Sequence, residues 1–336
     1  MGLATSSISN RISKAFVLGA GLGTRLQPLT RVLPKPLLPI FGKPLITFAF
    51  DHLLSVGIDN FIVNTHHLSG EFSELFESEV YENATIDLVY EPIRLETGGG
   101  MKNIENKIGD EIFIVYSGDI LTDIPIESLL DEHLTKNNDV TIALRNTGLS
   151  TAISWSPDSS RVVDIVGELD SSVPGQYDFA GLSVWNPSVF GRLPENESFS
   201  FIRTLIEWMR TGGAIGGVVM QSNNWFNIGS RREYLDVHRV IGHGKWIPNY
   251  LGGRAPHSSI HSEWPTNIDP SASIIGSNRI DASSYVGPGC NLGKDVELRN
   301  SVLFAGSLIS AESRFDSCVV AGVSVASGVY EENDFV

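Results

Sequence analysis

Short apolar runs alternate with amphipathic stretches over the first 145 residues of the chain. Ala15–Leu18 is an apolar run that ends at Gly19, which is typical of a buried strand. The stretch 43–56 repeats its apolar residues at helical spacing, and Pro44 suits a first helical turn. By the same criteria we expect strands at 61–63, 86–90, 112–116 and 140–144, and helices at 70–80, 98–108 and 125–136. This alternation predicts an α/β fold with a Rossmann-like sheet that is mixed but mostly parallel.

The pattern changes in the second half of the chain. Residues 152–185 are richer in strand patterns, helices are expected at 199–210 and 231–240, and 242–267 has no periodicity. Apolar residues then recur every six positions, at Ile268, Ile274, Ile280, Val286, Leu292, Leu298 and Phe304. A hexapeptide repeat predicts a short left-handed parallel β-helix with these side chains in its core. We therefore expect a flexible tail at 1–13, an α/β domain at 14–241, a linker at 242–266 and the β-helix at 267–336.

Composition narrows the protein class. The chain has 336 residues, of which 42% are hydrophobic and 19% charged, as in ordinary globular proteins. No apolar run approaches the roughly 20 residues of a membrane span, and the start of the chain has no secretory pattern. The two cysteines, Cys290 and Cys318, form no disulfide framework. A reducing, cytoplasmic location is therefore expected.

The charge distribution points to a local anion site. The formal net charge is −15, which argues against non-specific binding to nucleic acid or to an anionic membrane. Residues 1–50 nevertheless contain no Asp or Glu, and six basic residues lie there: Arg11, Lys14, Arg25, Arg31, Lys35 and Lys43. An acidic protein with one purely basic segment is expected to bind an anion with that segment.

A glycine-rich segment, Gly-Ala-Gly-Leu-Gly-Thr-Arg at 19–25, follows the first predicted strand. Glycines let the backbone approach a ligand closely, and successive amides in a turn can form an anion-binding concavity. We expect five residues of this segment to contact the nucleotide: Gly19, Ala20, Gly21, Gly23 and Thr24. Arg25 can neutralise phosphate oxygens. The spacing fits neither a Rossmann fingerprint nor a Walker loop, so the segment alone is also compatible with a plain strand–helix turn.

The segment continues without a break as Arg-Leu-Gln-Pro-Leu-Thr-Arg-Val-Leu-Pro-Lys-Pro-Leu-Leu-Pro at 25–39. This string resembles the signature of the sugar-phosphate nucleotidyltransferases, the nucleotide-sugar pyrophosphorylases. The resemblance implies that the glycine-rich loop holds a nucleoside triphosphate and that Arg25 and Lys35 are catalytic contacts to its phosphates. The prolines on both sides of Lys35 restrict the backbone and would hold its ammonium group in place.

Further segments match the same family between residues 14 and 240. Glu91–Gly100 resembles the segment that contacts base and ribose, which implies contacts from Thr97 and Gly98. Its Leu-Glu-Thr-Gly-Gly-Gly sequence at 95–100 is similar to the corresponding segment of N-acetylmuramate-1-phosphate uridylyltransferases and of some mannose-1-phosphate guanylyltransferase-like proteins. The stretch 179–185 resembles the strand beside the sugar, with Gly181 as the expected contact.

The resemblance also implies a Mg²⁺ site. Ser117-Gly-Asp119 follows a predicted strand, and Asp119 matches a metal-binding Asp of the family. A carboxylate at a strand end suits a hard divalent cation. The second family carboxylate lies in a Trp-x-Asp-x-Gly motif, but this chain has Asn227 at that position. Asn227 can offer its carbonyl oxygen without a negative charge, which should weaken the site or change its choice of ion. Asp123 is expected to cap the following helix.

Another departure concerns the sugar phosphate. Many family members carry a Glu-Lys-Pro motif for it, yet no lysine occurs between Lys136 and Lys245. Four arginines remain as alternatives: Arg161, Arg203, Arg231 and Arg232. His66 and His67 follow a strand without any partner at zinc spacing, so we expect ordinary core or surface histidines.

The resemblance implies transfer of a nucleoside monophosphate from a nucleoside triphosphate to a sugar 1-phosphate, with release of pyrophosphate. GTP with a mannose-like sugar and UTP with an amino sugar both remain open. One alternative is a non-catalytic homologue that senses nucleotide sugars, which Asn227 favours. The other is a hexapeptide acyltransferase, for which His257 and His261 lie just before the repeats. The flat sides and open end of a β-helix need covering, which indicates self-association through this segment.

Overall fold

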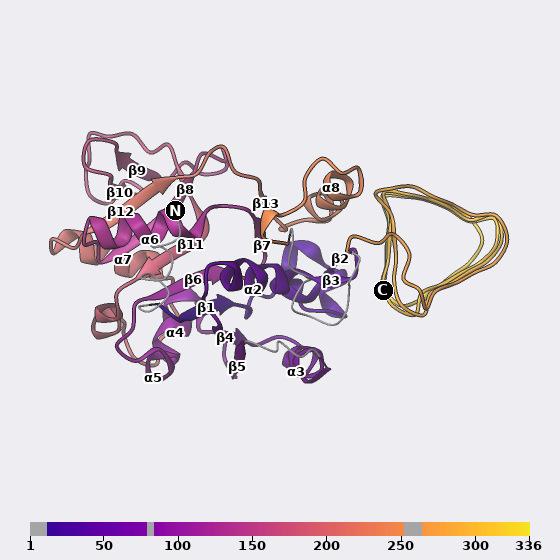
Figure 1. Cartoon of the computed structure of the whole chain (residues 1–336), viewed down its shortest axis with the longest axis horizontal. Helices are drawn as coiled ribbons and strands as arrows, with labels where there is room; N and C mark the ends of the chain where they lie inside the picture. The colour runs from indigo at the N-terminus through magenta and orange to yellow at the C-terminus, as the bar shows by residue number, and fades with distance from the viewer. Residues whose placement is uncertain (1–11, 79–83, 252–263) are drawn as a thin grey trace. The chain divides into compact units, whose positions relative to one another are not determined.

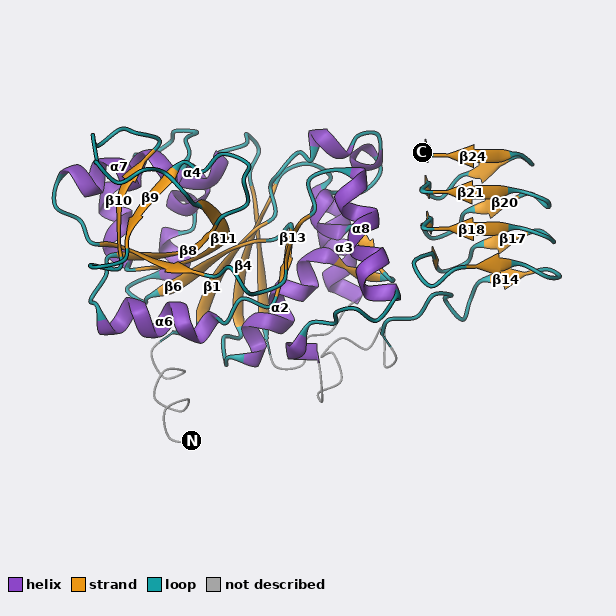
Figure 2. Ribbon diagram, turned by 90° about the horizontal axis from the view of Figure 1, so that it is seen from above, coloured by secondary structure: helices purple, strands orange, loops and turns teal. Residues whose placement is uncertain are grey.

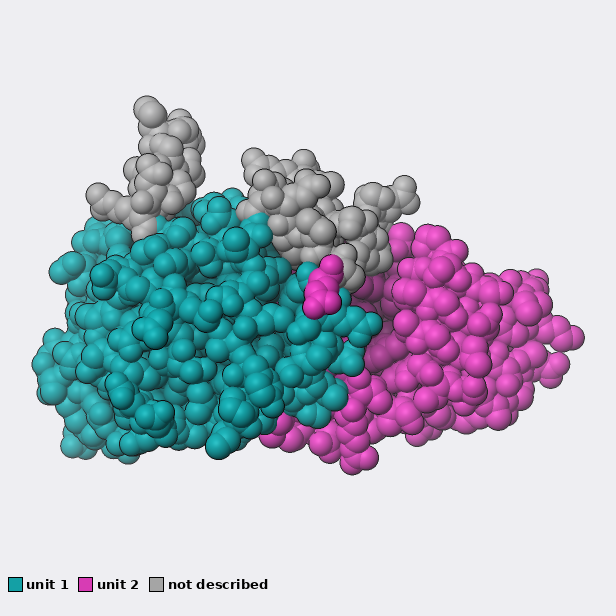
Figure 3. Space-filling view, turned by 90° about the horizontal axis from the view of Figure 1, so that it is seen from below, with its two compact units in different colours: residues 1–21, 49–76, 81–225 teal, residues 22–48, 77–80, 226–336 magenta. Residues whose placement is uncertain are grey.

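The structure, a computed structural model, describes residues 12–78, 84–251 and 264–336. It contains two compact units, each discontinuous in sequence, which Figure 3 shows in different colours. The first unit comprises residues 1–21, 49–76 and 81–225, and the second comprises 22–48, 77–80 and 226–336. Most of the expected tail at 1–13 and part of the expected linker at 242–266, including His257 and His261, lie outside the described residues. Within the described ranges, no helix combines the length and the apolar character that crossing a bilayer requires.

A nine-stranded sheet forms the first unit (Figure 1). Its order is β5 (Thr85–Tyr90), β4 (Asn60–Thr65), β1 (Lys14–Leu18), β6 (Phe113–Ser117), β11 (Asp178–Trp185), β8 (Val140–Arg145), β12 (Ile215–Val219), β10 (Arg161–Ile165) and β9 (Ile153–Ser156). The pairs from β5 to β6 are parallel, and β11 runs antiparallel to both of its neighbours. The mixed, mostly parallel sheet expected from the sequence is thus confirmed.

Helices cover both faces of this sheet. They are α2 (Leu45–Ser55), α3 (Ser69–Ser78), α4 (Glu96–Asn103), α5 (Glu105–Ile108), α6 (Ile126–Thr135) and α7 (Phe201–Arg210), with η4 (Pro187–Arg192) as a 3₁₀ turn. Figure 2 shows α6 on one face and α4 with α7 on the other. Phe16 and Phe113 of the central strands and Met101 of α4 share a core in which each is 0% exposed. Central strands buried on both faces read as continuous apolar runs, which is why the sequence revealed them.

The parallel strands bring functional segments to one edge. Leu18 is in register with both Asn64 of β4 and Ser117 of β6, so these strands end side by side. The Gly118 amide donates to the Leu18 carbonyl oxygen at 3.0 Å, which joins the two strand ends. Ligands of such sheets bind at the carboxyl ends of the strands. β7 (Ile120–Thr122) follows at this edge and pairs with β13 (Trp225–Asn227).

The second unit joins the segment 22–48 to α8 (Arg231–Gly242) and the β-helix. The segment contains three 3₁₀ turns and a hairpin: η1 (Thr24–Leu26), η2 (Leu29–Arg31), η3 (Lys35–Leu37), β2 (Pro39–Ile40) and β3 (Lys43–Pro44); a further turn, η5 (Asn249–Leu251), follows α8. The Pro39 carbonyl oxygen accepts hydrogen bonds from the Tyr234 hydroxyl at 2.6 Å and from His238 Nε2 at 3.2 Å. Two side chains of α8 therefore fix the backbone just after Lys35.

Three four-stranded parallel sheets make up the β-helix, and Figure 1 looks along its triangular coils. The sheets are β14 (Ser273–Ile274), β17 (Asn291–Leu292), β20 (Leu308–Ile309) and β23 (Ser324–Val325); β15 (Arg279–Ile280), β18 (Glu297–Arg299), β21 (Arg314–Asp316) and β24 (Val329–Glu331); and β16 (Tyr285–Val286), β19 (Val302–Leu303), β22 (Val319–Val320) and β25 (Asp334–Phe335). This architecture is the β-helix that the hexapeptide pattern predicted.

Two positions of the predicted repeat differ from the structure. Val286, Leu292 and Leu298 lie in the core as expected, but Leu303 occupies the place predicted for Phe304. The corner after Leu298 is one residue shorter than six-residue spacing requires, and Asn300 adopts a left-handed φ of 44° there. Coils shorten from 18 residues (Ser273 to Asn291) to 15 residues (Val319 to Asp334). Ile268 precedes the first sheet and is 40% exposed, so it does not fill the core.

One sheet of the β-helix packs against the rest of the second unit. The outward-facing Tyr285, Val302 and Val319 are at most 1% exposed. Tyr285 contacts Phe41 with ring centroids 6.2 Å apart, and Arg231 of α8 pairs with Asp334 at 3.6 Å. A Cβ on Gly242 would lie 1.9 Å from the Ala282 carbonyl oxygen, so the end of α8 touches a β-helix corner. Helix α8 therefore lies between the segment 22–48 and the β-helix.

His238 predicts how the stability of the protein responds to acid. Burial lowers its pKa to about 4, although the hydrogen bond to Pro39 opposes this effect. An unfolded histidine titrates near 6.5, so the unfolded state takes up the proton first. The stabilising contribution is complete above pH 6.5 and is lost as the pH falls toward 4. At pH 5 this histidine alone should lower the free energy of unfolding by about 2 kcal/mol.

The matched variant is His238→Gln, whose amide can still donate to Pro39 but does not titrate. Urea unfolding at pH 7.5 and 5.0 should show a smaller acid-induced loss for this variant than for the wild type. Equal losses in the two proteins would show that His238 is not responsible.

Candidate functional site

In the first unit, the site begins where β1 and β6 end. Gly19 leaves no room for a side chain, because a Cβ there would lie 2.6 Å from the Asn64 carbonyl oxygen. Asp119 follows β6 by two residues and is partly exposed. Gly181 has a φ of 88°, and a Cβ there would lie 2.0 Å from Ile120 and 3.2 Å from the Ser117 hydroxyl. The structure thus brings the segments of Gly19, Asp119 and Gly181 to the same sheet edge.

A buried hydrogen-bonded relay connects this edge to the segment before α4. The Gly19 amide donates to Asn64 Oδ1 at 2.8 Å, and Asn64 Nδ2 donates to Glu91 Oε1 at 2.8 Å. Glu91 Oε2 accepts from the Leu95 amide at 3.0 Å. Asn64 is 2% exposed and Glu91 is 0% exposed. We call Asn64 and Glu91, with their bonds to Gly19 and Leu95, the Asn64–Glu91 relay.

Sequence reasoning missed the relay as a feature of the site, although two signals were present. Asn64 directly follows the apolar run 61–63 of a buried strand, and Glu91 stands directly after the strand β5. A polar side chain within a buried strand must find hydrogen-bond partners in the interior. That requirement marks Asn64 as a residue with a specific partner, but the identity of the partner depends on which strands are neighbours.

The segment expected to contact base and ribose is fixed by α7 and the loop before it. The Gly98 amide donates to the Phe199 carbonyl oxygen at 2.8 Å, and a Cβ on Gly98 would lie 2.2 Å from the Phe199 ring. The Thr97 hydroxyl oxygen accepts from the Phe201 amide at 3.1 Å, which leaves its hydrogen available for another acceptor. Glu96 begins α4 with a φ of 59°, a conformation that non-glycine residues seldom adopt.

In the second unit, the signature loop folds tightly on itself. Gly23 has φ 60° and ψ 33°, and a Cβ there would lie 2.7 Å from Thr30 Cγ2 and 3.1 Å from Lys35 Cβ. The Thr30 hydroxyl donates to the Gly23 carbonyl oxygen at 3.0 Å. Lys35 is 7% exposed and stands between the buried Pro34 and Pro36. The aliphatic part of Lys35 therefore packs on Gly23, and the loop conformation depends on glycine there.

Arg25 and Asn227 lie near the start of α8. The Arg25 guanidinium is so close to Gly229 that a Cβ on this glycine would lie 2.8 Å from Nη2. Ser230 and Glu233 form a capping box: the Glu233 amide donates to Ser230 Oγ at 3.3 Å, and Glu233 Oε2 accepts from the Gly229 amide at 3.0 Å. The backbone carbonyl oxygen of Asn227, not its side chain, accepts from the Gly229 amide at 2.8 Å. The cap thus fixes the backbone beside Arg25 and Asn227.

The two expected metal ligands belong to different units, Asp119 to the first and Asn227 to the second. Both offer oxygen atoms, which are the donors that Mg²⁺ prefers. The described residues contain no group of three or more His, Cys, Asp or Glu side chains placed to hold a metal ion. Each donor by itself is of a kind that fits Mg²⁺, whose shell is commonly completed by phosphate oxygens and water.

The polar edge also includes buried titratable groups that the sequence did not single out. His52 Nδ1 lies 3.2 Å from the Tyr116 hydroxyl in the interior. Burial lowers the pKa of His52 to about 3, although the charge of Asp123 opposes this. The same burial, helped by Asp123, raises the pKa of Tyr116. Both groups are therefore neutral near pH 7 and act as structural hydrogen-bonding partners.

One sequence expectation was wrong. Asp123 does not cap α6, because the residue at the cap position is Pro125 and no side chain bonds there. The Asp123 carboxylate instead accepts from the backbone amide of Asn224 at 2.8 Å and from its side chain at 3.0 Å. Pro125 restricts the chain before the helix, so Asp123 is two residues too early to reach the first helical amides.

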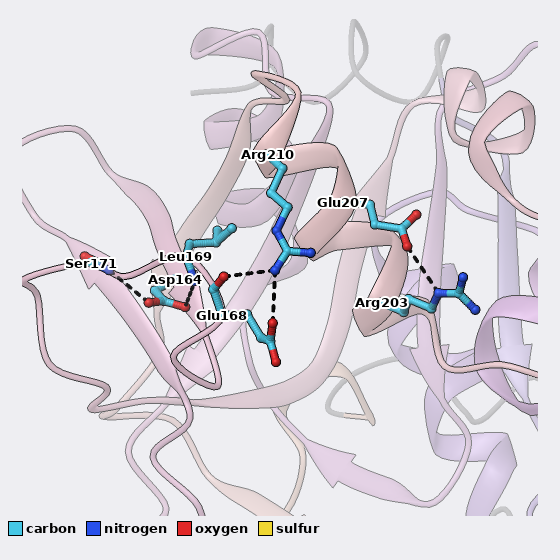
Figure 4. A network of polar contacts seen from close by, with 7 residues as sticks. All are labelled: Asp164, Glu168, Leu169, Ser171, Arg203, Glu207 and Arg210. Carbon is cyan, nitrogen blue, oxygen red and sulfur yellow. Dashed lines mark hydrogen bonds and ion pairs between the residues drawn. The ribbon is translucent and has the colours of Figure 1, made fainter.

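The four arginines considered for the sugar phosphate all have partners within their own units. Arg203 pairs with Glu207 at 3.2 Å on the exposed side of α7, as Figure 4 shows, and Arg232 pairs with Asp236 at 3.9 Å. Arg161 donates to Asn138 and to the Lys136 carbonyl oxygen, and Arg231 pairs with Asp334. Each would have to exchange these contacts to bind a phosphate. His66 Nδ1 donates to the Glu91 carbonyl oxygen at 2.7 Å, and among the described residues His66 belongs to no group of three or more potential metal ligands.

Comparisons with known proteins identify the family and the fold. The mannose-1-phosphate guanylyltransferase of Mycobacterium tuberculosis is 28% identical over 88% of this chain and 81% of its own length. The UTP--glucose-1-phosphate uridylyltransferase of Synechocystis sp. is 24% identical over 92% of this chain and 87% of its own length. Among solved structures, HddC from Yersinia pseudotuberculosis shares the fold, with a TM-score of 0.55 and 22% identity over 67% of this chain and 97% of its own. Residues 14–243 match the family described as Nucleotidyl transferase, and the chain belongs to this family.

Proposed function

We propose that the protein transfers a nucleoside monophosphate from a nucleoside triphosphate to a sugar 1-phosphate and releases pyrophosphate. The observation that carries the proposal is the placement of Lys35. A lysine that is 7% exposed, stands between two buried prolines and packs its Cβ on Gly23 has its side chain held against the glycine-rich loop. A cation held beside backbone amides stabilises a polyphosphate and the charge that develops on it.

The reaction needs little acid–base chemistry. The phosphate of the sugar 1-phosphate has a second pKa of about 6, so it is largely dianionic near neutral pH and can attack without a general base. An oxygen of this phosphate attacks the α-phosphorus in line, and the bond from the α-phosphorus to the bridging oxygen of pyrophosphate breaks. Catalysis then consists of positioning and charge neutralisation. Arg25 and Lys35 neutralise the leaving pyrophosphate, and the amides of Ala20, Gly21 and Gly23 with the Thr24 hydroxyl hold the triphosphate. Gly19 begins this loop, and its own amide stays bonded to Asn64 Oδ1.

The remaining site residues have supporting roles. Thr97 and Gly98 contact base and ribose, and Gly181 lies beside the sugar. Asp119 and Asn227 would hold Mg²⁺, which neutralises phosphate charge when bound. Asn227 would contribute an uncharged oxygen, so Asp119 would be the one carboxylate of this pair and substrate phosphates would supply further negative charge. The two free, buried thiols of Cys290 and Cys318 are consistent with a reducing compartment such as the cytoplasm.

The relatives indicate which substrates to test first. GTP with mannose 1-phosphate and UTP with glucose 1-phosphate are the pairs in the names of the two relatives described above, and UTP with an amino-sugar 1-phosphate follows from the Leu-Glu-Thr segment. The experiment incubates the full chain with each pair and Mg²⁺ and measures released pyrophosphate. At least one pair should react, and EDTA should stop the reaction. Absence of pyrophosphate from every pair would contradict the proposal.

A regulatory homologue is the second candidate, because Asn227 removes a negative charge from the metal site. It predicts binding of a nucleotide sugar, seen as a rise in melting temperature, without any pyrophosphate release. The acyltransferase alternative has less support. The sequence 264–336 contains no histidine, and His257 and His261 lie outside the described residues.

A further inference from the structure

The Asn64–Glu91 relay connects the two segments to which nucleotide binding is assigned. One end bonds to the amide of Gly19, the first residue of the glycine-rich loop. The other end bonds to the amide of Leu95, two residues before Thr97. Gly19 and Leu95 are far apart in the sequence. Within the first unit, the side chains of Asn64 and Glu91 connect their two amides. We propose that Asn64 and Glu91 are positioning residues that set the spacing between the phosphate-binding loop and the base-binding segment.

Both side chains of the relay are buried in the first unit. Glu91 is 0% exposed, and moving an ionised carboxylate from water into the interior is unfavourable unless hydrogen bonds compensate. It has two such bonds, from Asn64 Nδ2 and the Leu95 amide. A Cβ on Gly100 would lie 2.9 Å from Glu91 Oε1 and 3.1 Å from Asn64 Nδ2, so α4 closes over the pair. Turning the carboxylate away would break both of these hydrogen bonds.

The pattern of donors and acceptors makes the relay directional. Asn64 must accept at Oδ1 from Gly19 and donate at Nδ2 to Glu91, while Glu91 must accept twice. In Glu91→Gln, the amide has one accepting oxygen, so either Asn64 Nδ2 or the Leu95 amide faces another donor. In Asn64→Asp, two carboxylates face each other. Each single change therefore breaks one connection and leaves the other segment in place.

The exchanged pair Asn64→Asp/Glu91→Gln restores all three hydrogen bonds. The new aspartate accepts from Gly19 and from the glutamine amide, and the glutamine oxygen accepts from Leu95. The carboxylate moves from position 91 to position 64, and it stays buried. Recovery in the double variant would be specific to the relay, because two independent structural defects would add.

The inference rests on the proposed function, so the first readout is the dissociation constant of a nucleoside triphosphate, measured by calorimetry without turnover. Each single variant should weaken binding by about 10- to 100-fold, as expected when groups that position a ligand are misplaced. The exchanged pair should recover most of this loss. KM for the sugar 1-phosphate should change little in all three.

A matched control is Thr141→Val in β8. Thr141 is 0% exposed, and its hydroxyl accepts from Asn138 Nδ2 at 2.8 Å, so the variant also breaks a buried polar contact of the same sheet. It should lower the melting temperature without weakening nucleotide binding. Single relay variants that behave like this control would overturn the proposal, and so would an exchanged pair that binds no better than the singles.

Hydrogen exchange separates the relay from the proposed function. Without any substrate, at least one of the amides of Gly19 and Leu95 should exchange faster in each single variant, and both should exchange slowly again in the exchanged pair. If the wild type binds nucleotide but releases no pyrophosphate, the proposed function fails while the binding and exchange results still decide the relay. Unchanged exchange at both amides in the single variants would overturn the relay even in an active enzyme.

Discussion

Replacing Lys35 with methionine is expected to lower kcat by about 10²- to 10³-fold, the usual effect of removing one fixed group that stabilises transition-state charge. Methionine suits this test because Lys35 is 7% exposed and its aliphatic part packs on Gly23. The unbranched, uncharged side chain of methionine fills most of the same space, so the loss of the ammonium group is separated from the loss of packing. Pyrophosphate release under saturating substrates measures kcat.

Arg31→Ala is the control for Lys35→Met. Arg31 is a basic residue of the same segment, but it is exposed at the end of η2. Its removal should change kcat little, which tests whether net charge alone explains the result. Melting temperatures close to the wild type in both variants would establish that the loop is folded. A kcat for Lys35→Met within tenfold of the wild type would remove Lys35 from the mechanism.

Replacing Gly21 with alanine is expected to weaken nucleoside triphosphate binding by about tenfold or more while leaving the fold intact. Gly19 and Gly23 are explained by their neighbours, because a Cβ would collide with Asn64 in one case and with Thr30 in the other. At Gly21 a Cβ would meet nothing within 4 Å, and its φ lies outside the left-handed region. The proposed triphosphate, lying close to the backbone, supplies a reason for glycine there.

Stability and binding should therefore change in different directions for Gly21→Ala. Alanine at a compatible position stabilises a protein by about 0.4–1 kcal/mol through the unfolded state. Gly70→Ala in α3 is the control, since a Cβ there also meets nothing within 4 Å. Both variants should be at least as stable as the wild type, and only Gly21→Ala should bind the triphosphate more weakly. Equal affinity of both would place the phosphates elsewhere.

The central fold was predictable because the buried strands carry their own signal. The predicted run 15–18 corresponds to β1 (Lys14–Leu18), and 112–116 to β6 (Phe113–Ser117). Where neighbours decide the structure, local patterns were insufficient. Lys43 and Pro44 were expected to begin a helix, but they pair with Pro39 and Ile40 as β3, and α2 starts at Leu45. The helix expected at 98–108 is interrupted at Ile104, which ends α4 and precedes α5.

The candidate site was predictable to the extent that its motifs are contiguous. The glycine-rich loop and the segment before Gly98 are each continuous in sequence, so their residues could be named individually. The Asn64–Glu91 relay could not be inferred, because its hydrogen bonds depend on β1, β4 and the end of β5 being neighbours. The corner at Asn300 shows the same limit, since one residue fewer shifts the inward position to Leu303.

The position of α8 has a practical consequence for work with this protein. The family match ends at residue 243, directly after α8, yet Phe41 and Arg231 make contacts with Tyr285 and Asp334 further along the chain. A recombinant fragment trimmed to residues 14–243 would uncover the side of α8 and the apolar surface around Phe41. Such a fragment would not be autonomous, and its aggregation during expression would reflect the missing coils and not a defective nucleotide-binding loop.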